Sequence, residues 1–298
     1  AAFGRGSRLV IAKIPRSPYT CRTLASRRFP EHGRGFAVAT GGLMALDIDT
    51  FSNVSGGFSF FKALGHPLAA PKFRDMLADL AGSGPVAVYD PLGHAAAFAS
   101  LHDVDALTIA GVFVQDLEAI GQPVIGHTAE PVTLLPDSGA TRVLVLAFDA
   151  DRLIAQIGHL LPKGARVVSL DAGRLDDDMV TSPRHYLDPI NFATNFAFFR
   201  DGDGHHTRLV TANYWGGYGA KNTKFWFCLL DSSGQALADW WLDAPAANGL
   251  IVVDSQDIRQ RFNLAGFTGQ LFIHVVGGAG HDVVKYALDT YGDADSVL

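Results

Sequence analysis

The first half of the chain alternates between two hydrophobic patterns. Phe73, Met76, Leu77 and Leu80 recur at i, i+3, i+4 and i+7, which predicts an amphipathic helix with Pro71 near its first turn. An Ala-rich run and a run of spaced leucines and isoleucines predict further helices, at 93–101 and 153–161. Short apolar runs bounded by turn residues predict strands, at 85–90, 107–114, 142–148 and 165–170, with a short extended piece at 123–126.

This alternation predicts a parallel sheet covered by helices on both faces. We therefore expect a Rossmann-like α/β domain over residues 44–170. In such sheets, ligands bind beyond the carboxyl ends of the strands, where the strand order reverses. That rule selects candidate ligand-binding residues at the predicted strand ends, which are Gly93, His94, Asp116 and Asp149.

From about Asn195 the period changes to two. Alternating segments separated by Asp-Gly or Gly-rich turns predict strands, at 195–200, 205–212, 223–231, 235–242, 250–254, 269–276 and 282–289. Asp257 to Phe262 predicts a single helical turn. The second half is therefore expected to be a β-sandwich over residues 195–298, and residues 171–194 to be the linker between the domains.

Composition narrows the class of protein. The chain is 48% hydrophobic and 18% charged, which is typical of a folded globular protein. Its apolar runs fall short of the ~18 residues that a membrane helix needs, so no membrane span is expected. Cys21 and Cys228 are too far apart in sequence to indicate a disulfide framework or a metal cluster. We therefore expect a reducing, cytoplasmic compartment.

The net charge of −6 is unevenly distributed. Residues 1–40 contain eight basic residues and one acid, so they carry +7 and the remainder carries −13. An acidic body argues against a nucleic-acid partner. Residues 1–43 could be a targeting peptide, a nucleic-acid or membrane-surface arm, or upstream sequence translated with the gene. We favour the last interpretation, with no fold in this segment, because Met44 opens the first stretch that is typical of a domain.

The turn after the first predicted strand holds the main candidate for chemistry. A dinucleotide fingerprint requires three glycines that let backbone N–H groups approach a pyrophosphate. Only Gly93 is present here, Pro91 has no N–H, and Asp90 would repel phosphate, which argues against an NAD site. His94 could bind a sugar or phosphate, or be an exposed surface residue. Asp116 is placed where a ribose-binding acid would lie, or is simply a loop carboxylate.

Three polar clusters contain residue types that bind metals, but none of the three is predicted to bind metal. Asp176, Asp177 and Asp178, near His185 and Asp188, match no ligand spacing and favour a solvated cap. The Asp-Gly-Asp-Gly run at 201–204 lacks the downstream Glu of a calcium loop and favours a hairpin turn. His205 and His206 are adjacent on a strand, so their side chains should point to opposite faces.

Aromatic residues are the clearest binding signal in the second half. Tyr214, Trp215 and Tyr218 occupy a Gly-rich stretch, which predicts an exposed loop able to stack on a glycan or a partner. The alternative is that another part of the chain covers this face. Trp240 and Trp241 are neighbours on a predicted strand, so one should be core and the other on the outer face.

Two segments resemble known families. "VAVYDPLGHAAAF", "IAGVFVQD", "IGQPVIGHTAE" and "TRVLVLAFDADRL", within residues 85–170, are similar to the nucleotide-sugar-binding domain of bacterial sugar acyltransferases of the sialic-acid O-acetyltransferase type. Asp90-Pro91-Leu92 replaces the glycines of that family's turn, and the hexapeptide-repeat β-helix that carries acyl transfer is missing. "FWFCLLDSSGQALADWWLDAP" at 225–245 resembles bacterial immunoglobulin-like modules, which implies an immunoglobulin-like sandwich.

Three classes of function follow. The leading hypothesis is a ligand-binding protein of bacterial glycan metabolism, with a nucleotide sugar in the α/β half and a glycan or partner on the sandwich. The second is a sugar- or acyl-modifying enzyme that uses the Asp90–His94 turn, with His94 as general base and Asp116 as the orienting acid. The third is a non-catalytic structural or assembly module. A small-molecule ligand or glycan is the expected partner. No cofactor is evident from the sequence, and a nucleotide sugar or NAD is the alternative.

Overall fold

The computed structural model describes residues 9–12, 48–51 and 57–293. The chain divides into two compact units, residues 1–57 and 58–298. In the first unit, β1 (Leu9–Ala12) pairs antiparallel with β2 (Ile48–Phe51), so one strand does form inside the segment in which no fold is expected. The rest of residues 1–43 lies outside the described residues, and the interpretation of its origin stays a prediction.

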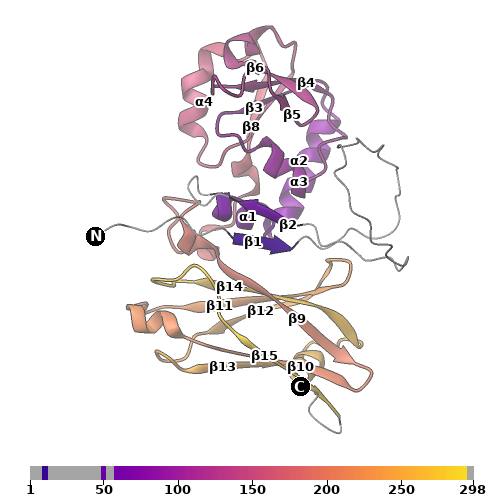
Figure 1. Cartoon of the computed structure of the whole chain (residues 1–298), viewed down its shortest axis with the longest axis vertical. Coiled ribbons are helices and arrows are strands. Elements are labelled where there is room, and N and C mark those ends of the chain that lie inside the picture. Colours follow the sequence, from indigo (N-terminus) through magenta and orange to yellow (C-terminus); the bar gives the residue numbers. More distant parts are fainter. Residues whose placement is uncertain (1–8, 13–47, 52–56, 294–298) are drawn as a thin grey trace, which may run out of the picture. The chain divides into compact units, whose positions relative to one another are not determined.

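The second unit begins with an α/β part (Figure 1). Its sheet has the order β5-β6-β4-β3-β7-β8, in which β5 is antiparallel to β6 and the other neighbours are parallel. The strands are β3 (Val86–Asp90), β4 (Ile109–Val114), β5 (Pro123–Val124), β6 (His127–Pro131), β7 (Arg142–Val145) and β8 (Arg166–Ser169). The helices are α1 (Gly57–Leu64), α2 (Ala69–Ala81), α3 (Ala95–Leu101) and α4 (Asp151–Ile157), with 3-10 turns η2 (Val132–Asp137) and η3 (Gly158–Leu160).

Both faces of this sheet are buried, as a parallel sheet requires. Val86, Val88 and Leu144 point into one hydrophobic core, and Ala87, Tyr89 and Val143 point into another. The first core receives Phe73, Met76, Leu77 and Leu80 of α2, the four residues whose spacing predicts that helix. It also receives Phe60 and Leu64 of α1, a helix that the sequence analysis missed.

The segment 171–194 connects the two halves, but it is a packed element and not a free spacer. It forms the 3-10 turns η4 (Leu170–Gly173), η5 (Asp177–Met179) and η6 (Pro189–Phe192). Leu175, Met179 and Tyr186 are buried in the same core as α2. The connection is therefore fixed against the α/β part by its own side chains.

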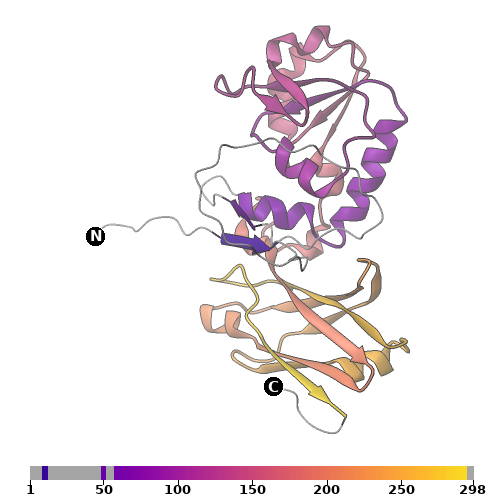
Figure 2. The ribbon, with the colours of Figure 1, turned by 45° about the vertical axis from the view of Figure 1, so that its right-hand side comes forward.

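The all-β part has two layers (Figures 1 and 2). Its strands are β9 (Ala193–Gly202), β10 (His205–Ala212), β11 (Lys224–Asp231), β12 (Ala236–Asp243), β13 (Leu250–Asp254), β14 (Phe267–Val276) and β15 (Ala287–Gly292), with η7 (Tyr214–Tyr218) and α5 (Ser255–Arg261). β9 pairs with β10 only at the two residue pairs beside their turn. One layer is therefore β12-β11-β14-β9, and the other is β13-β10-β15. Residues 282–286, predicted as part of the last strand, form a loop before β15.

The two central strands of the four-stranded layer, β11 and β14, are covered on both faces. Phe225, Phe227 and Ile273 face the three-stranded layer and form the sandwich core. Trp226 and Phe272 point to the opposite face and belong to the same core as Phe60 and Leu64 of α1. Period-two alternation thus supplies two hydrophobic faces from the same strands.

The free edge of β9 is blocked by side chains. The backbone N–H of Phe196 donates to Oδ1 of Asn195 at 2.9 Å, and its C=O accepts the hydroxyl of Tyr286. The N–H of Arg200 donates to Oγ1 of Thr207 at 3.2 Å. These bonds satisfy backbone groups that have no strand beside them.

Candidate functional site

The predicted ligand-binding residues lie at the carboxyl ends of neighbouring strands. Gly93 and His94 follow β3, Asp116 follows β4, and Asp149 follows β7. The chain order reverses between β3 and β7, so their two loops flank the position where ligands bind in open α/β sheets. Asp116 is exposed, and its Oδ1 accepts the N–H of Glu118 at 2.9 Å, which is the loop-carboxylate interpretation.

Asp90, the last residue of β3, caps the helix that follows. Its Oδ1 accepts the N–H of His94 at 2.7 Å and its Oδ2 accepts the N–H of Ala95 at 2.9 Å. Asp90 is only 4% exposed. Because these are the N–H groups that would bind a phosphate at this turn, the carboxylate occupies the place of an external anion.

His94 is held by contacts on two sides. Its ring stacks on Phe60 with a centroid separation of 3.8 Å, and its Nδ1 is 3.2 Å from the carbonyl oxygen of Leu146. A carbonyl only accepts, so Nδ1 carries the proton and Nε2 carries the lone pair. Burial lowers the pKa of His94, although the Leu146 carbonyl and Asp90 oppose this shift. Gly93 adopts φ +73°, a left-handed conformation that suits glycine, and its Cβ position is open.

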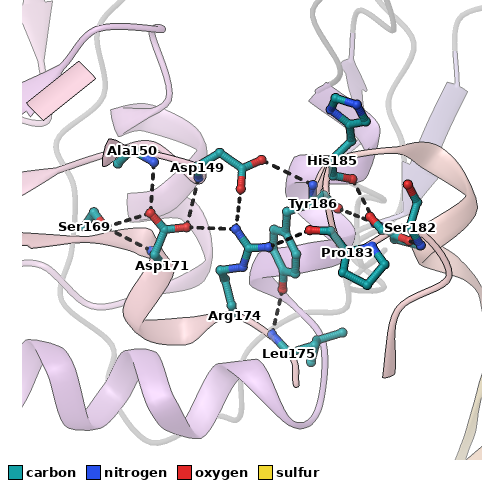
Figure 3. Close-up of polar contacts among 11 residues, drawn as sticks. Asp149, Ala150, Ser169, Asp171, Arg174, Leu175, Ser182, Pro183, His185 and Tyr186 are labelled. Carbon is teal, nitrogen blue, oxygen red and sulfur yellow. Dashed lines mark hydrogen bonds and ion pairs between the residues drawn. The ribbon is translucent and has the colours of Figure 1, made fainter. Parts of the chain in front are cut away.

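Asp149 belongs to a polar network that sequence reasoning did not find (Figure 3). Its backbone has φ +50°, which an aspartate adopts more readily than most residues. The N–H groups of Asp149 and Ala150 donate to Oδ1 and Oδ2 of Asp171, both at 2.9 Å. The carboxylate of Asp171 therefore accepts N–H groups at the start of α4, as that of Asp90 does at the start of α3.

Arg174 completes this network, which we call the Arg174 cluster (Asp149, Asp171, Arg174 and Tyr186). The Nη1 of Arg174 donates to Asp149 and to Oδ1 of Asp171, and its Nη2 donates to the carbonyl of Pro183 at 3.2 Å. Its guanidinium lies 4.4 Å from the centroid of the Tyr186 ring. Burial opposes the charge, but the two carboxylates prevail and raise the pKa of Arg174.

Tyr186 ties the same cluster to the connecting segment. Its backbone N–H donates to Oδ2 of Asp149 at 3.2 Å, and its hydroxyl accepts the N–H of Leu175 at 2.9 Å. The charged groups of the Arg174 cluster are therefore engaged with one another and with backbone. These bonds hold residues 171–186 against the loop of Asp149. The sequence did not predict them, because Asp171 and Arg174 lie 22 and 25 residues after Asp149.

The aromatic loop differs from the prediction at its central residue. Trp215 is fully buried in η7, where its Nε1 donates to the carbonyl of His281 at 2.8 Å and its ring stacks on Tyr214. A Cβ atom on Gly278 would lie 2.8 Å from Cδ1 of Trp215, so glycine allows the close approach. The expectation that Trp215 is a surface recognition residue is wrong, because η7 turns its ring into the sandwich core.

Tyr218 does reach the surface, and it is 59% exposed. Its ring meets the imidazole of His281 edge to face, with centroids 4.7 Å apart and planes at 86°. Gly280, with φ +75°, lies against the ring so closely that a Cβ would be 2.9 Å from Cγ of Tyr218. Tyr214 holds the loop between β14 and β15, since its hydroxyl donates to the carbonyl of Val283 and accepts the N–H of Lys285.

The other polar candidates have structural roles. Asp176, Asp177 and Asp178 are exposed, and Lys72 pairs with Asp176 at 3.2 Å. Asp203 and Gly204 form the turn between β9 and β10, so the run at 201–204 belongs to a hairpin turn as predicted. His205 is exposed and His206 is buried, so the two side chains point to opposite faces as predicted. Trp240 is buried and Trp241 is exposed, which confirms their predicted alternation.

The part of the chain that the structure describes contains neither a metal-binding cluster nor a helix that could span a membrane. Residues 9–12, 48–51 and 57–293 contain no group of three or more His, Cys, Asp or Glu side chains that could hold a metal ion. In the same residues, no helix has the length and apolar character to cross a bilayer. No protein-family model and no curated protein matches this chain.

Proposed function

We propose that this chain is a non-catalytic binding protein that recognises a glycan through Tyr218 and His281. The exposure of Tyr218 beside the imidazole of His281 carries the proposal. A phenol ring offers a flat apolar face that stacks on a sugar at a low cost in side-chain entropy, and an imidazole offers a hydrogen-bond donor or acceptor to a hydroxyl.

The supporting residues favour a preorganised surface. Trp215 anchors η7 through its bond to the carbonyl of His281, so the residue that places Tyr218 also places the imidazole. The Tyr214 hydroxyl bridges Val283 and Lys285 in the loop between β14 and β15, which also carries His281. A surface held in this way loses little freedom when it binds.

Glycan binding by matched variants tests this proposal. Isothermal titration with chitin, cellulose and sialic-acid oligosaccharides should show at least one ligand whose affinity falls tenfold or more in Tyr218→Ala and in His281→Ala. Phe198→Ala is the control, because Phe198 is also an exposed ring, at 49%, on the outer face of β9. The absence of binding to every glycan, or an equal loss in Phe198→Ala, would refute the proposal.

A nucleotide-sugar site in the α/β part is the second candidate. Counted along the chain, the five parallel strands have the order 3-2-1-4-5, which supports a Rossmann-like sheet with its ligand position between β3 and β7. Asp90 and Asp171 argue against a phosphate there, because each already caps a helix at that edge. The two-layer all-β part likewise supports, as a proposal, an immunoglobulin-like sandwich.

A thermal-shift screen tests whether a nucleotide or nucleotide sugar binds at the carboxyl ends of β3 and β7. Nucleotides, nucleotide sugars and coenzyme A would each be added at high concentration. A ligand at 100 times its dissociation constant adds about 2.7 kcal/mol. We expect no shift, and a shift that His94→Gln removes would favour the nucleotide-sugar site. Turnover of that ligand, lost in the same variant, would favour the enzyme that uses the Asp90–His94 turn.

A further inference from the structure

Two histidines meet where the connection between α1 and α2 contacts the four-stranded layer. His66 lies in that connection and His274 lies on β14, and both are fully buried. Nε2 of His66 is 2.8 Å from Nδ1 of His274. The ring of His66 packs on Trp226 and Phe272, with centroid separations of 5.5 and 4.9 Å.

Hydrogen-bond direction fixes where the protons of this pair lie. The backbone N–H of Leu68 donates to Nδ1 of His66 at 3.2 Å, so Nδ1 carries a lone pair and the proton is on Nε2. That Nε2–H then donates to Nδ1 of His274, which places the proton of His274 on its own Nε2. Within the described residues that Nε2 has no hydrogen-bond partner. Both rings are neutral in this arrangement.

An added proton has no place in this chain of bonds. On His66 it would attach to Nδ1 and face the N–H of Leu68. On His274 it would attach to Nδ1 and face the Nε2–H of His66. Each case sets two donors against each other, so a proton breaks one of the two bonds at a site that excludes water.

The charged groups around the pair also oppose a proton. Lys72 of α2 acts on His66, and Lys62 of α1 acts on His274. Asp282, the acid that acts on Lys62, contributes its carbonyl oxygen to the Lys62 ammonium at 2.7 Å. Burial lowers the pKa of His66 well below its ordinary value, and the neighbouring His274 and Lys72 lower it further. Burial and Lys62 lower the pKa of His274 to about 3.

We propose that the His66–His274 pair is an acid-sensitive latch that holds α1 and α2 on the sandwich at neutral pH and releases them in acid. Once separated, both imidazoles regain ordinary pKa values near 6.5 and bind a proton each. Since both folded-state pKa values are depressed, the contribution of the latch is complete above pH 6.5 and falls as the pH drops below it. Two protons raise the opening constant about 100-fold per pH unit there.

Lys62 does not add to this dependence. Burial lowers its pKa to about 8, which leaves it charged below pH 7 whether the latch is closed or open. The window from pH 6.5 to pH 5 therefore isolates the imidazoles from the lysine.

Hydrogen exchange of the full chain between pH 7.5 and pH 5, corrected for intrinsic rates, tests the latch. Protection of α1 and β14 should fall by about 100-fold per pH unit below 6.5, relative to α4. In His274→Asn the side-chain oxygen still accepts from His66 but does not titrate, so the fall should shrink to about tenfold. His205→Asn, an exposed histidine on β10, should leave it unchanged.

Each result is decisive. A constant ratio of protection between α1 and α4 across the pH range overturns the latch from the wild-type chain alone, even if His274→Asn does not fold. The same dependence in His274→Asn as in wild type overturns it as well, and so does a loss of the dependence in His205→Asn.

Discussion

Gly173 lies against the ring of Phe73, and a Cβ atom on the glycine would be 2.2 Å from Cε1 of that ring. The first residue is in η4 and the second is in α2, so this contact sets how closely the connecting segment packs on the helix. Phe73 is fully buried, and protein cores are close-packed.

We therefore expect Gly173→Ala to lower the free energy of unfolding by about 1–3 kcal/mol through overpacking. Urea unfolding measures the change. Gly158→Ala is the matched control, because its Cβ position is open and its φ of −52° suits alanine. That control should leave stability unchanged or raise it by less than about 1 kcal/mol. Equal losses in the two variants would contradict the packing argument.

Asp90→Ala should cost about 2 kcal/mol, because two N–H groups at the start of α3, one of them buried, lose their acceptor. Asp116→Ala, at the end of the next strand, removes one bond from an exposed turn and should cost less than about 0.5 kcal/mol. Denaturant midpoints of the two variants at equal m-values give the comparison. A cost for Asp116→Ala as large as that for Asp90→Ala would mean that burial does not separate their roles.

Trp215→Ala should lower the free energy of unfolding by about 3–5 kcal/mol, as expected for a large ring removed from a core. Trp241→Ala, at 41% exposure on the outer face of β12, should cost about 1 kcal/mol or less. Thermal unfolding followed by circular dichroism distinguishes the two. A small loss at Trp215 would restore the interpretation of this residue as part of a recognition surface.

The stability that His206 gives the sandwich should depend on pH in the opposite sense to that of the His66–His274 latch. Burial disfavours its charge, but the ring donates to Asp293 at 2.8 Å and lies beside Asp201, and these two carboxylates prevail, so the pKa of His206 is raised above 6.5. A raised folded-state pKa gives stability that is complete below pH 6.5 and is lost as the pH rises through the folded-state pKa.

His206→Asn should therefore cost more stability at pH 6 than at pH 9. Urea unfolding of the variant and the wild type at both pH values measures the difference. The exposed neighbour His205→Asn provides the control, with the same small effect at each pH. A cost for His206→Asn that grows with pH would show that the two carboxylates do not hold a protonated ring.

The features that the sequence predicted correctly are those that depend on residues close together in the chain. The i, i+3, i+4 and i+7 spacing from Phe73 to Leu80 sets both the extent of α2 and its buried face. The opposite exposures of Trp240 and Trp241 follow from strand geometry alone. Helix α1 escaped prediction because two turns are too short for a periodic signal, although Phe60 and Leu64 are core residues.

Distant partners account for the remaining differences. The glycines around Trp215 indicate a loop correctly, but its burial depends on residues 278–281, more than sixty positions later. Asp171 binds the amides of Asp149 and Ala150, and Arg174 binds the carboxylate of Asp149, so both depend on a loop more than twenty residues away. That Asp90 repels phosphate stays a prediction from its charge, whereas its use as a helix cap requires the geometry of the turn.

The blocked edge of β9 bears on how this protein behaves when it is crowded. An open strand edge is a template on which another chain can add and start an aggregate. Here the amide and carbonyl of Phe196 and the amide of Arg200 are already bonded to side chains of the same molecule. An incoming strand must first displace the Tyr286 hydroxyl and the Thr207 hydroxyl, so these two side chains hinder fibril growth from this side of the sandwich.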